Sequence, residues 1–305
     1  MPPIRRALLL AAPAILVLGG CSSGLPDPDH ADVAYATLSP AQTLDLYLPD
    51  GTGPFPLVIN IHGGGFRMGD KDMLDAPIAE ALLARGIAVA SIDYRLSDEA
   101  KFPAAIEDAK AAVRYLRANA GRYRLDPERF LVFGQSAGGN LASLVGTTGN
   151  AAVFDNHALG NPGVSSKVNA VIDWFGPTEF LQMDPQAREQ GCPPEHGAAD
   201  SPESAYLGAP IASVPEKVRA ASPMTYIDRE DPPFLLQKGS EDCLVPVGQS
   251  KLLKQALATA GVPVELDLLE GAGHGDMGVS TPIFLSQSNV ERVVAFAERH
   301  LKQAP

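Results

Sequence analysis

One serine stands among small residues near the middle of the chain and is the first candidate for chemistry. Residues 133–140 read FGQSAGGN, which places Ser136 in a G-x-S-x-G pattern directly after the apolar run at 130–133. Glycines on both sides of a serine permit the strained strand-to-helix turn on which a nucleophilic hydroxyl is presented. The pattern also occurs by chance, so a plain flexible turn is the alternative. A base, an acid and oxyanion donors elsewhere in the chain would favour the nucleophile.

The sequence HGGGF at residues 62–66 offers such donors. It follows the apolar run at 57–61, and its three successive glycines leave backbone N–H groups uncovered by side chains. N–H groups of this kind stabilise the oxyanion of a tetrahedral intermediate, by about 3–4 kcal/mol per donor. A glycine-rich turn without chemistry is the alternative, which the company of Ser136 disfavours.

A general base and an acid are also available. Of the six histidines, only His274, in GAGHG at 271–275, follows a predicted buried strand on a tight glycine turn. Glu241 and Asp242 follow another predicted strand, and both qualify on chemistry as the acid that orients a histidine. The chain therefore contains every part that an activated serine needs.

The elements that must position these residues alternate between strand and helix. Apolar or alternating runs predict strands, and 3.6-residue periodicity predicts helices. The expected strands are 33–36, 44–48, 57–61, 87–92, 130–133, 168–174, 234–236 and 264–269, and the expected helices are 73–85, one starting at Pro103, 138–145, 246–260 and 286–302. This order predicts an α/β fold, with a mostly parallel central sheet covered by helices on both faces and an antiparallel edge at its start.

One segment interrupts that order. Residues 176–232 are rich in Pro, Gly and Ala and contain no long periodic run. Because the segment is longer than ordinary connections, we expect an irregular cap or lid inserted into the sheet.

The N-terminus indicates export. Residues 1–20 combine Arg5 and Arg6 with an apolar stretch too short to span a bilayer, as in a signal peptide. The sequence LGGC at 18–21 looks like a bacterial lipobox, which predicts a lipid on Cys21, a polar tether over 21–32 and a domain over 33–303. An ordinary secretory signal with an incidental Cys21 is the alternative. The expected location is extracytoplasmic, with the protein anchored to a membrane by that lipid.

The net charge restricts the partners that the chain is expected to bind. Removing residues 1–20 removes two arginines and no acids, which changes the formal net charge from −12 to −14. An acidic surface repels phosphate backbones, so no nucleic-acid partner is expected.

Besides Cys21 the chain has Cys192 and Cys243, which in an exported protein suggest a disulfide. Two buried free thiols are the alternative.

Together these stretches resemble the α/β-hydrolase superfamily, and within it the bacterial carboxylesterases related to hormone-sensitive lipase and the BD-FAE-like feruloyl/acetyl esterases. The matching motifs are HGGGF at 62, DYRL at 93, GQSAGG at 134, G-x-x-D-x-x-V-P at 239 and GAGHG at 271. The resemblance places the acid at Asp242 and implies a triad of Ser136, Asp242 and His274, in the order that this fold uses.

The same resemblance implies the remaining parts of the site. It assigns the oxyanion hole to the backbone N–H groups of Gly64, Gly65 and Ala137, and it requires no metal and no cofactor. Where lipase relatives often carry Asp before the serine, this chain has Gln135, which favours the esterase branch.

Aromatic residues near strand ends are candidates for the substrate pocket. Tyr94, Trp174 and Phe175 fall at or near carboxyl ends of predicted strands, where such sheets bind ligands. Their alternative role is core packing. Asp93 and Arg95 are expected to form a charge pair that braces the oxyanion loop.

The resulting expectation is a serine carboxylesterase acting on short-chain or aromatic esters, either small molecules or carbohydrate-linked. Because free histidine has a pKa of about 6.5, activity should fall on acidification. A serine peptidase of the prolyl-oligopeptidase type and a non-catalytic surface-binding module on the same fold are the alternatives. The sequence gives no indication of the oligomeric state.

Overall fold

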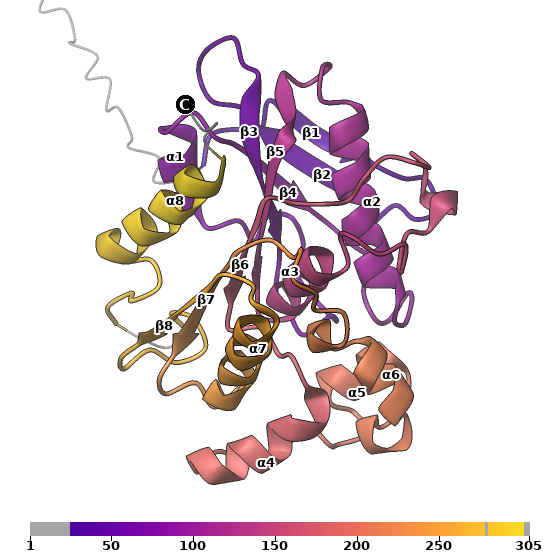
Figure 1. Cartoon of the computed structure of the whole chain (residues 1–305), viewed down its shortest axis with the longest axis vertical. Helices are drawn as coiled ribbons and strands as arrows, with labels where there is room; N and C mark the ends of the chain where they lie inside the picture. The colour runs from indigo at the N-terminus through magenta and orange to yellow at the C-terminus, as the bar shows by residue number, and fades with distance from the viewer. Residues whose placement is uncertain (1–24, 278–279, 302–305) are drawn as a thin grey trace, which may run out of the picture.

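An eight-stranded sheet runs through the protein, whose computed structural model describes residues 25–277 and 280–301 (Figure 1). The strands lie in the order β1-β2-β4-β3-β5-β6-β7-β8; β2 is antiparallel to β1 and β4, and the other neighbours are parallel. Their bounds are β1 His30–Ala34, β2 Thr43–Tyr47, β3 Phe55–Ile61, β4 Ala88–Ile92, β5 Leu125–Gln135, β6 Ala170–Trp174, β7 Phe234–Gly239 and β8 Val264–Leu269. The predicted α/β fold with an antiparallel edge is confirmed.

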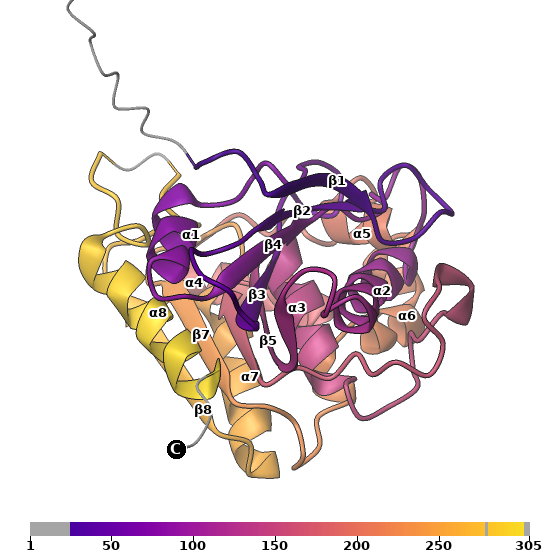
Figure 2. The ribbon, with the colours of Figure 1, turned by 90° about the horizontal axis from the view of Figure 1, so that it is seen from above.

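Helices cover both faces of the sheet. Figures 1 and 2 show α1 and α8 together on one side and α2 and α3 on the other. Along β5, Phe130 and Val132 belong to the core cluster that includes residues of α2, α3 and α7, whereas Leu131 and Phe133 belong to the cluster that includes residues of α1 and α8. A strand buried on both faces reads as a continuous apolar run for this reason. The helices are α1 Ala76–Leu83, α2 Ala104–Ala118, α3 Ala137–Thr147, α7 Val247–Ala260 and α8 Gln287–Leu301.

The segment between β6 and β7 is more regular than predicted. It contains the helices α4 Phe180–Gln190, α5 Pro202–Leu207 and α6 Pro215–Ala220, which gather at one end of the molecule in Figure 1. Helix α4 forms although Pro185 lies inside it, because Phe180, Met183 and Ala187 bury one face of the helix. That short apolar stripe is the periodic signal that the proline and glycine content concealed. The segment also contains the short 3-10 turns η2 Ile211–Ser213 and η3 Pro223–Thr225, and a further turn, η1 His157–Leu159, lies before β6.

The folded domain begins earlier than predicted. Strand β1 starts at His30, inside the expected tether over 21–32, and pairs with β2. The Asp32 amide also donates to Asp45 Oδ1 at 2.7 Å, which holds this edge of the sheet. The signal peptide and Cys21 lie outside the described residues. No helix within the described ranges has the length and apolar character that a membrane span requires.

Candidate active site

Ser136 lies on a sharp turn between β5 and α3. Its φ of 53° is in the left-handed region that non-glycine residues rarely adopt. A Cβ atom added at Gly134 would lie 2.0 Å from the carbonyl oxygen of Gly138, and one at Gly138 would lie 2.0 Å from that of Ile61. Only glycine therefore permits the close approach of β3, β5 and α3 that carries this turn.

Three side chains from separate loops form one hydrogen-bonded chain. His274 Nε2 lies 2.9 Å from Ser136 Oγ, and His274 Nδ1 lies 2.8 Å from Asp242 Oδ2. Asp242 follows β7 and His274 follows β8, so both come from the carboxyl ends of parallel strands. Of the two acids that qualified by their chemistry, Asp242 makes this contact, whereas Glu241 is exposed. The geometry is that of a nucleophile, a base and an orienting acid.

Asp242 is fully buried and held in its ionised form. Its Oδ1 accepts N–H hydrogen bonds from Leu244 at 2.8 Å and from Val245 at 2.9 Å. Burial alone would raise the pKa of Asp242, but the hydrogen bond from His274 and the charge of Lys238 outweigh it and lower the pKa to about 2. A charged acid keeps the proton of the imidazole on Nδ1 and leaves Nε2 as the proton acceptor.

Lys238 belongs to this site although sequence analysis did not identify it. Its side chain is fully buried, and its Nζ lies 2.5 Å from Asp242 Oδ2 and also donates to the carbonyl oxygen of Val245. The signal was a lysine at the end of the apolar strand sequence FLLQK at 234–238. A lysine in that position must find a buried partner, because an unpaired ammonium is costly to desolvate.

Three backbone N–H groups close to the serine have no acceptor. In the part of the chain that the structure describes, no hydrogen bond uses the N–H groups of Gly64, Gly65 or Ala137. The glycine loop comes close to the nucleophile, since a Cβ added at Gly63 would lie 3.4 Å from Ser136 Cβ. Gly64 and Gly65 have φ values of 99° and 61°, which favour glycine at both positions.

A cavity of about 960 Å³ opens at Ser136. Of the three aromatic residues predicted to line a pocket, Trp174 and Phe175 line this cavity and Tyr94 does not. The prediction for Tyr94 was wrong because its ring packs in the core: it stacks on His62 with centroids 4.3 Å apart and donates to the His62 carbonyl at 3.1 Å. The position of Tyr94 after a strand indicated at which end of the sheet it lies, but not the direction in which its ring points.

The wall and rim of the cavity are largely apolar. The Phe175 ring lies 4.5 Å from the imidazole of His274 and 4.9 Å from the ring of Phe284, measured between centroids. The rim carries four large apolar side chains that are 50–67% exposed, namely Met68, Met73, Leu244 and Met277. Exposed apolar side chains gathered around one opening are typical of a ligand-binding surface.

Polar groups interrupt this apolar lining at a few points. Asp75 precedes α1 but makes no side-chain cap to it; instead its Oδ2 accepts a hydrogen bond from Gln135, the neighbour of Ser136. Among the described residues, the other oxygen of Asp75 has no hydrogen-bond donor. Burial raises the pKa of Asp75. Arg67 and Asp98 also line the cavity.

Comparison with known proteins identifies the family. The BD-FAE family model matches residues 44–257, more than half of the chain, including Ser136 and Asp242. The chain belongs to the BD-FAE family.

Individual relatives of this BD-FAE domain are esterases. Esterase LipC of Mycobacterium tuberculosis is 30% identical over an alignment of 268 positions, which covers 83% of this chain but only 64% of LipC. A truncated form of a carbohydrate esterase from gut microbiota has a TM-score of 0.80 and 31% identity, covering 90% of this chain and 96% of that one. The bifunctional GH43-CE of Bacteroides eggerthii has a TM-score of 0.81 and 33% identity, covering 90% and 35% respectively.

In this BD-FAE domain the charges after β4 pair differently from the prediction. Arg95 does not pair with Asp93 but with Asp108 of α2, through two hydrogen bonds of 2.8 Å. Asp93 accepts hydrogen bonds from the Lys71 amide at 2.6 Å and from Thr43 Oγ1 at 3.1 Å. Asp93 and Arg95 lie close together in the sequence, but their side chains bond to different partners. The predicted charge pair is therefore wrong.

The predicted disulfide is present. Cys192, which follows α4, is bonded to Cys243, and the two Cα atoms lie 5.3 Å apart. Cys243 directly follows Asp242, so the bond joins the β6–β7 insertion to the loop of the candidate catalytic acid.

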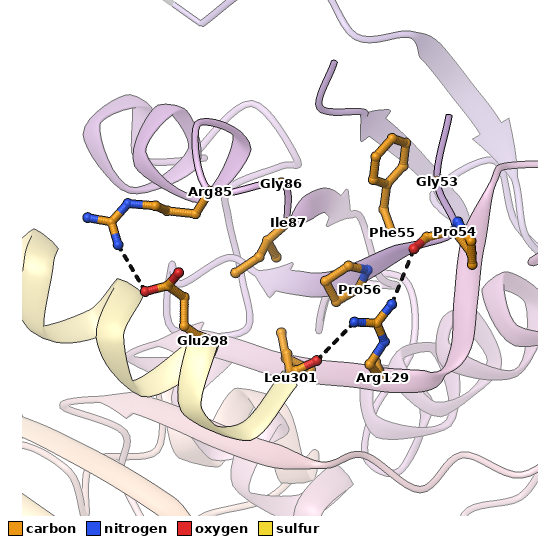
Figure 3. Close-up of a pocket in the computed structure, with 10 residues that line it drawn as sticks. All are labelled: Gly53, Pro54, Phe55, Pro56, Arg85, Gly86, Ile87, Arg129, Glu298 and Leu301. Carbon is orange, nitrogen blue, oxygen red and sulfur yellow. Dashed lines mark hydrogen bonds and ion pairs between the residues drawn. The ribbon is translucent and has the colours of Figure 1, made fainter. Parts of the chain in front are cut away.

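A second cavity, of about 270 Å³, lies at the opposite, amino-terminal end of the strands (Figure 3). Its charged groups are engaged within the protein: Arg85 pairs with Glu298, and Arg129 donates to the carbonyls of Leu301 and Pro54. These contacts join α8 to the sheet, which gives this cavity a structural explanation.

Proposed function

We propose that the protein is a serine carboxylesterase that hydrolyses short-chain or aromatic carboxylic esters. The observation that carries the proposal is the hydrogen-bonded chain from Ser136 through His274 to Asp242, next to three backbone N–H groups without acceptors. Fold alone would not support an activity, but this combination of nucleophile, base, acid and oxyanion donors serves acyl transfer.

The mechanism follows from the positions of these atoms. His274 Nε2 removes the Ser136 hydroxyl proton as Oγ attacks the ester carbonyl carbon, and the N–H groups of Gly64, Gly65 and Ala137 stabilise the oxyanion. The carbonyl re-forms, the ester C–O bond breaks, and the imidazolium gives its proton to the leaving alcohol. Water then attacks the acyl-enzyme with His274 again as base, which releases the acid and restores Ser136.

The size and lining of the cavity suit esters with small or aromatic acyl and alcohol groups. Its volume of about 960 Å³ and the aromatic rings of Phe175 and Phe284 beside His274 suit an ester whose groups pack flat against the wall. The exposed rim methionines, Met68, Met73 and Met277, are flexible enough to fit several shapes of apolar group.

Carbohydrate-linked esters are the substrate class that we favour. Sugars present several hydroxyl donors, and the Asp75 oxygen that has no donor among the described residues is an acceptor for them. Asp75 lies near the nucleophile, because its other oxygen is bonded to Gln135, the residue before Ser136. Arg67 and Asp98 add a donor and a second acceptor to the same cavity. The relative at TM-score 0.80 is described as a carbohydrate esterase, which supports this assignment.

The protein would act outside the cytoplasm. The LGGC sequence at 18–21 supports lipid attachment at Cys21, and the Cys192–Cys243 disulfide suits an oxidising compartment. Labelling cells with a fatty-acid analogue would test this: the protein should take up label, and the Cys21→Ala variant should not.

Hydrolysis of p-nitrophenyl esters from acetate to palmitate tests the esterase, alongside acetylated xylo-oligosaccharides. We expect turnover that is fastest for short chains and lost in Ser136→Ala, while Ser213→Ala, which changes an exposed serine away from the cavity, retains it. Turnover of proline-containing peptides instead would support the peptidase alternative. Binding of polysaccharide without turnover of any ester would support a non-catalytic module.

A further inference from the structure

Two donors share one oxygen of the candidate catalytic acid. Asp242 Oδ2 accepts from His274 Nδ1 at 2.8 Å and from Lys238 Nζ at 2.5 Å, while the donors to Asp242 Oδ1 among the described residues are the backbone N–H groups of Leu244 and Val245. The general mechanism of a serine triad needs the histidine contact but not the lysine. The acyl-transfer steps therefore do not explain the presence of Lys238 beside the candidate acid.

Lys238 is placed to act on charge rather than on shape. Its side chain and that of Asp242 are both fully buried, so water screens their interaction little. The pKa of Lys238 is lowered, because burial outweighs the opposing effect of the Asp242 carboxylate. We take the ammonium as charged in this pair because its Nζ donates to the Asp242 carboxylate and to the Val245 carbonyl, and because a buried carboxylate without its counter-charge would bear a large desolvation cost.

Few other ionisable groups act on this pair. Asp173, at the end of β6, is the second carboxylate whose charge reaches Lys238. Its own oxygens accept hydrogen bonds from Ser143 Oγ and from the Gly176 amide, both at 2.8 Å. Burial raises the pKa of Asp173. Lys238 and His274 are thus the groups whose charges lower the pKa of Asp242.

We propose that Lys238 is a positioning residue that sets the pH range of the esterase by partly neutralising Asp242. The inference rests on the proposed function, since it acts through the same triad. With Lys238 charged, the field of the carboxylate at His274 is reduced, so the imidazole stays neutral and able to accept a proton at lower pH. Lys238 also fixes the Asp242 loop by bridging its carboxylate and the Val245 carbonyl.

The sign of the effect is specific. Without the ammonium, the whole carboxylate charge would favour the imidazolium, and the base would be lost at a higher pH. Replacing Lys238 by Met, a side chain of similar length without charge, should move the acid limb of the kcat/KM profile upward by about 1 pH unit. Lys238→Gln, which restores one donor but no charge, should show the same shift. Lys238→Arg should return the limb toward its original position.

The experiment measures p-nitrophenyl acetate hydrolysis and fluorophosphonate labelling of Ser136 against pH for the full chain and the three variants. An upward shift of the acid limb in Lys238→Met and Lys238→Gln but not in Lys238→Arg supports the proposal. An unshifted acid limb in both neutral variants, or an equal shift in Lys238→Arg, overturns it. If the unaltered protein labels with the fluorophosphonate but hydrolyses no ester, the proposed function fails while the labelling profiles still test Lys238.

A measurement on the unaltered protein guards against variants that do not fold. NMR titration of the Asp242 carboxyl carbon should find it ionised down to its pKa of about 2. Titration near the ordinary aspartate value of about 3.9 would mean that neither the Lys238 ammonium nor His274 holds the acid in its charged form, and would overturn the proposal.

Discussion

Gln190, the last residue of α4, donates a hydrogen bond to the main-chain carbonyl of Asp242 at 2.8 Å. Its side-chain oxygen accepts from the Val247 amide at 3.0 Å, so this glutamine spans the loop that carries the candidate acid. The Cys192–Cys243 disulfide lies beside this contact. The β6–β7 insertion therefore supports the catalytic loop directly, in addition to bordering the cavity.

Breaking that disulfide should affect both stability and turnover. The bond closes a loop over a sequence separation of 51, worth about 4 kcal/mol on the chain-entropy model. In a Cys192→Ser, Cys243→Ser protein we expect a lower melting temperature and, because the Asp242 loop is loosened, a kcat reduced about tenfold. Dithiothreitol should reproduce both effects in the unaltered protein and have none in the variant. A lower melting temperature with unchanged kcat at low temperature would refute the link to catalysis.

Asp75 should control the choice between sugar esters and simple esters. A charged acceptor that meets a sugar hydroxyl contributes about 1.5–3 kcal/mol, so Asp75→Ala should lower kcat/KM for acetylated xylo-oligosaccharides about 10–100-fold. The rate with p-nitrophenyl acetate should fall much less, because that substrate has no hydroxyl to bind. Asp72→Ala is the matched control, since its side chain is 81% exposed and does not line the cavity. An equal loss on both substrates would assign Asp75 to the structure of the nucleophile turn instead.

Gly138 should tolerate no side chain. A Cβ there would lie 2.0 Å from the Ile61 carbonyl oxygen and 2.5 Å from that of His62, so α3 would have to move away from β3. We expect Gly138→Ala to lose about 2–4 kcal/mol of unfolding free energy, measured by urea denaturation, together with most activity. Gly121→Ala is the control, because a Cβ there meets nothing within 4 Å and its stability should change little. Equal stabilities for the two variants would contradict the close approach at the turn.

Sequence reasoning predicted the fold class and the succession of strands and helices along the chain, because the central strands are short apolar runs separated by helical patterns. The G-x-S-x-G and HGGGF stretches could be recognised because close approach of backbone segments requires glycine, and glycines are visible in the sequence. Asp242 could be separated from Glu241 only by resemblance, since two adjacent carboxylates have the same chemistry. The structure separates them by burial and by the contact to His274.

What sequence reasoning missed depends on the direction of each side chain and on the partner that it meets in the fold. The ring of Tyr94 turned toward His62, and Arg95 reached α2, neither of which is fixed by position along the chain. Lys238 was missed although Asp242 lies only four residues further along, because the sequence does not show that both side chains are buried. Gln190 was missed because α4 was expected to be irregular.

The loop before β7 carries a carboxyl group that should make stability depend on pH. Burial, together with the nearby charge of Asp228, raises the pKa of Asp231 to about 7, and Asp231 Oδ1 has no hydrogen-bond partner among the described residues. The folded protein then holds a proton that the unfolded chain has already lost, so the contribution to stability is full below about pH 4 and is lost as pH rises to about 7.

Replacing Asp231 by Asn removes the charge at nearly constant shape. We expect Asp231→Asn to raise the free energy of unfolding by about 1–2 kcal/mol at pH 8 and to leave it nearly unchanged at pH 4, where the aspartate is already protonated in the fold. Urea denaturation at both pH values measures this difference. Asp50→Asn, at an exposed position, should change stability at neither pH. A gain of the same size at pH 4 and pH 8 would show that Asp231 takes up no proton on folding between these pH values, and would contradict its raised pKa.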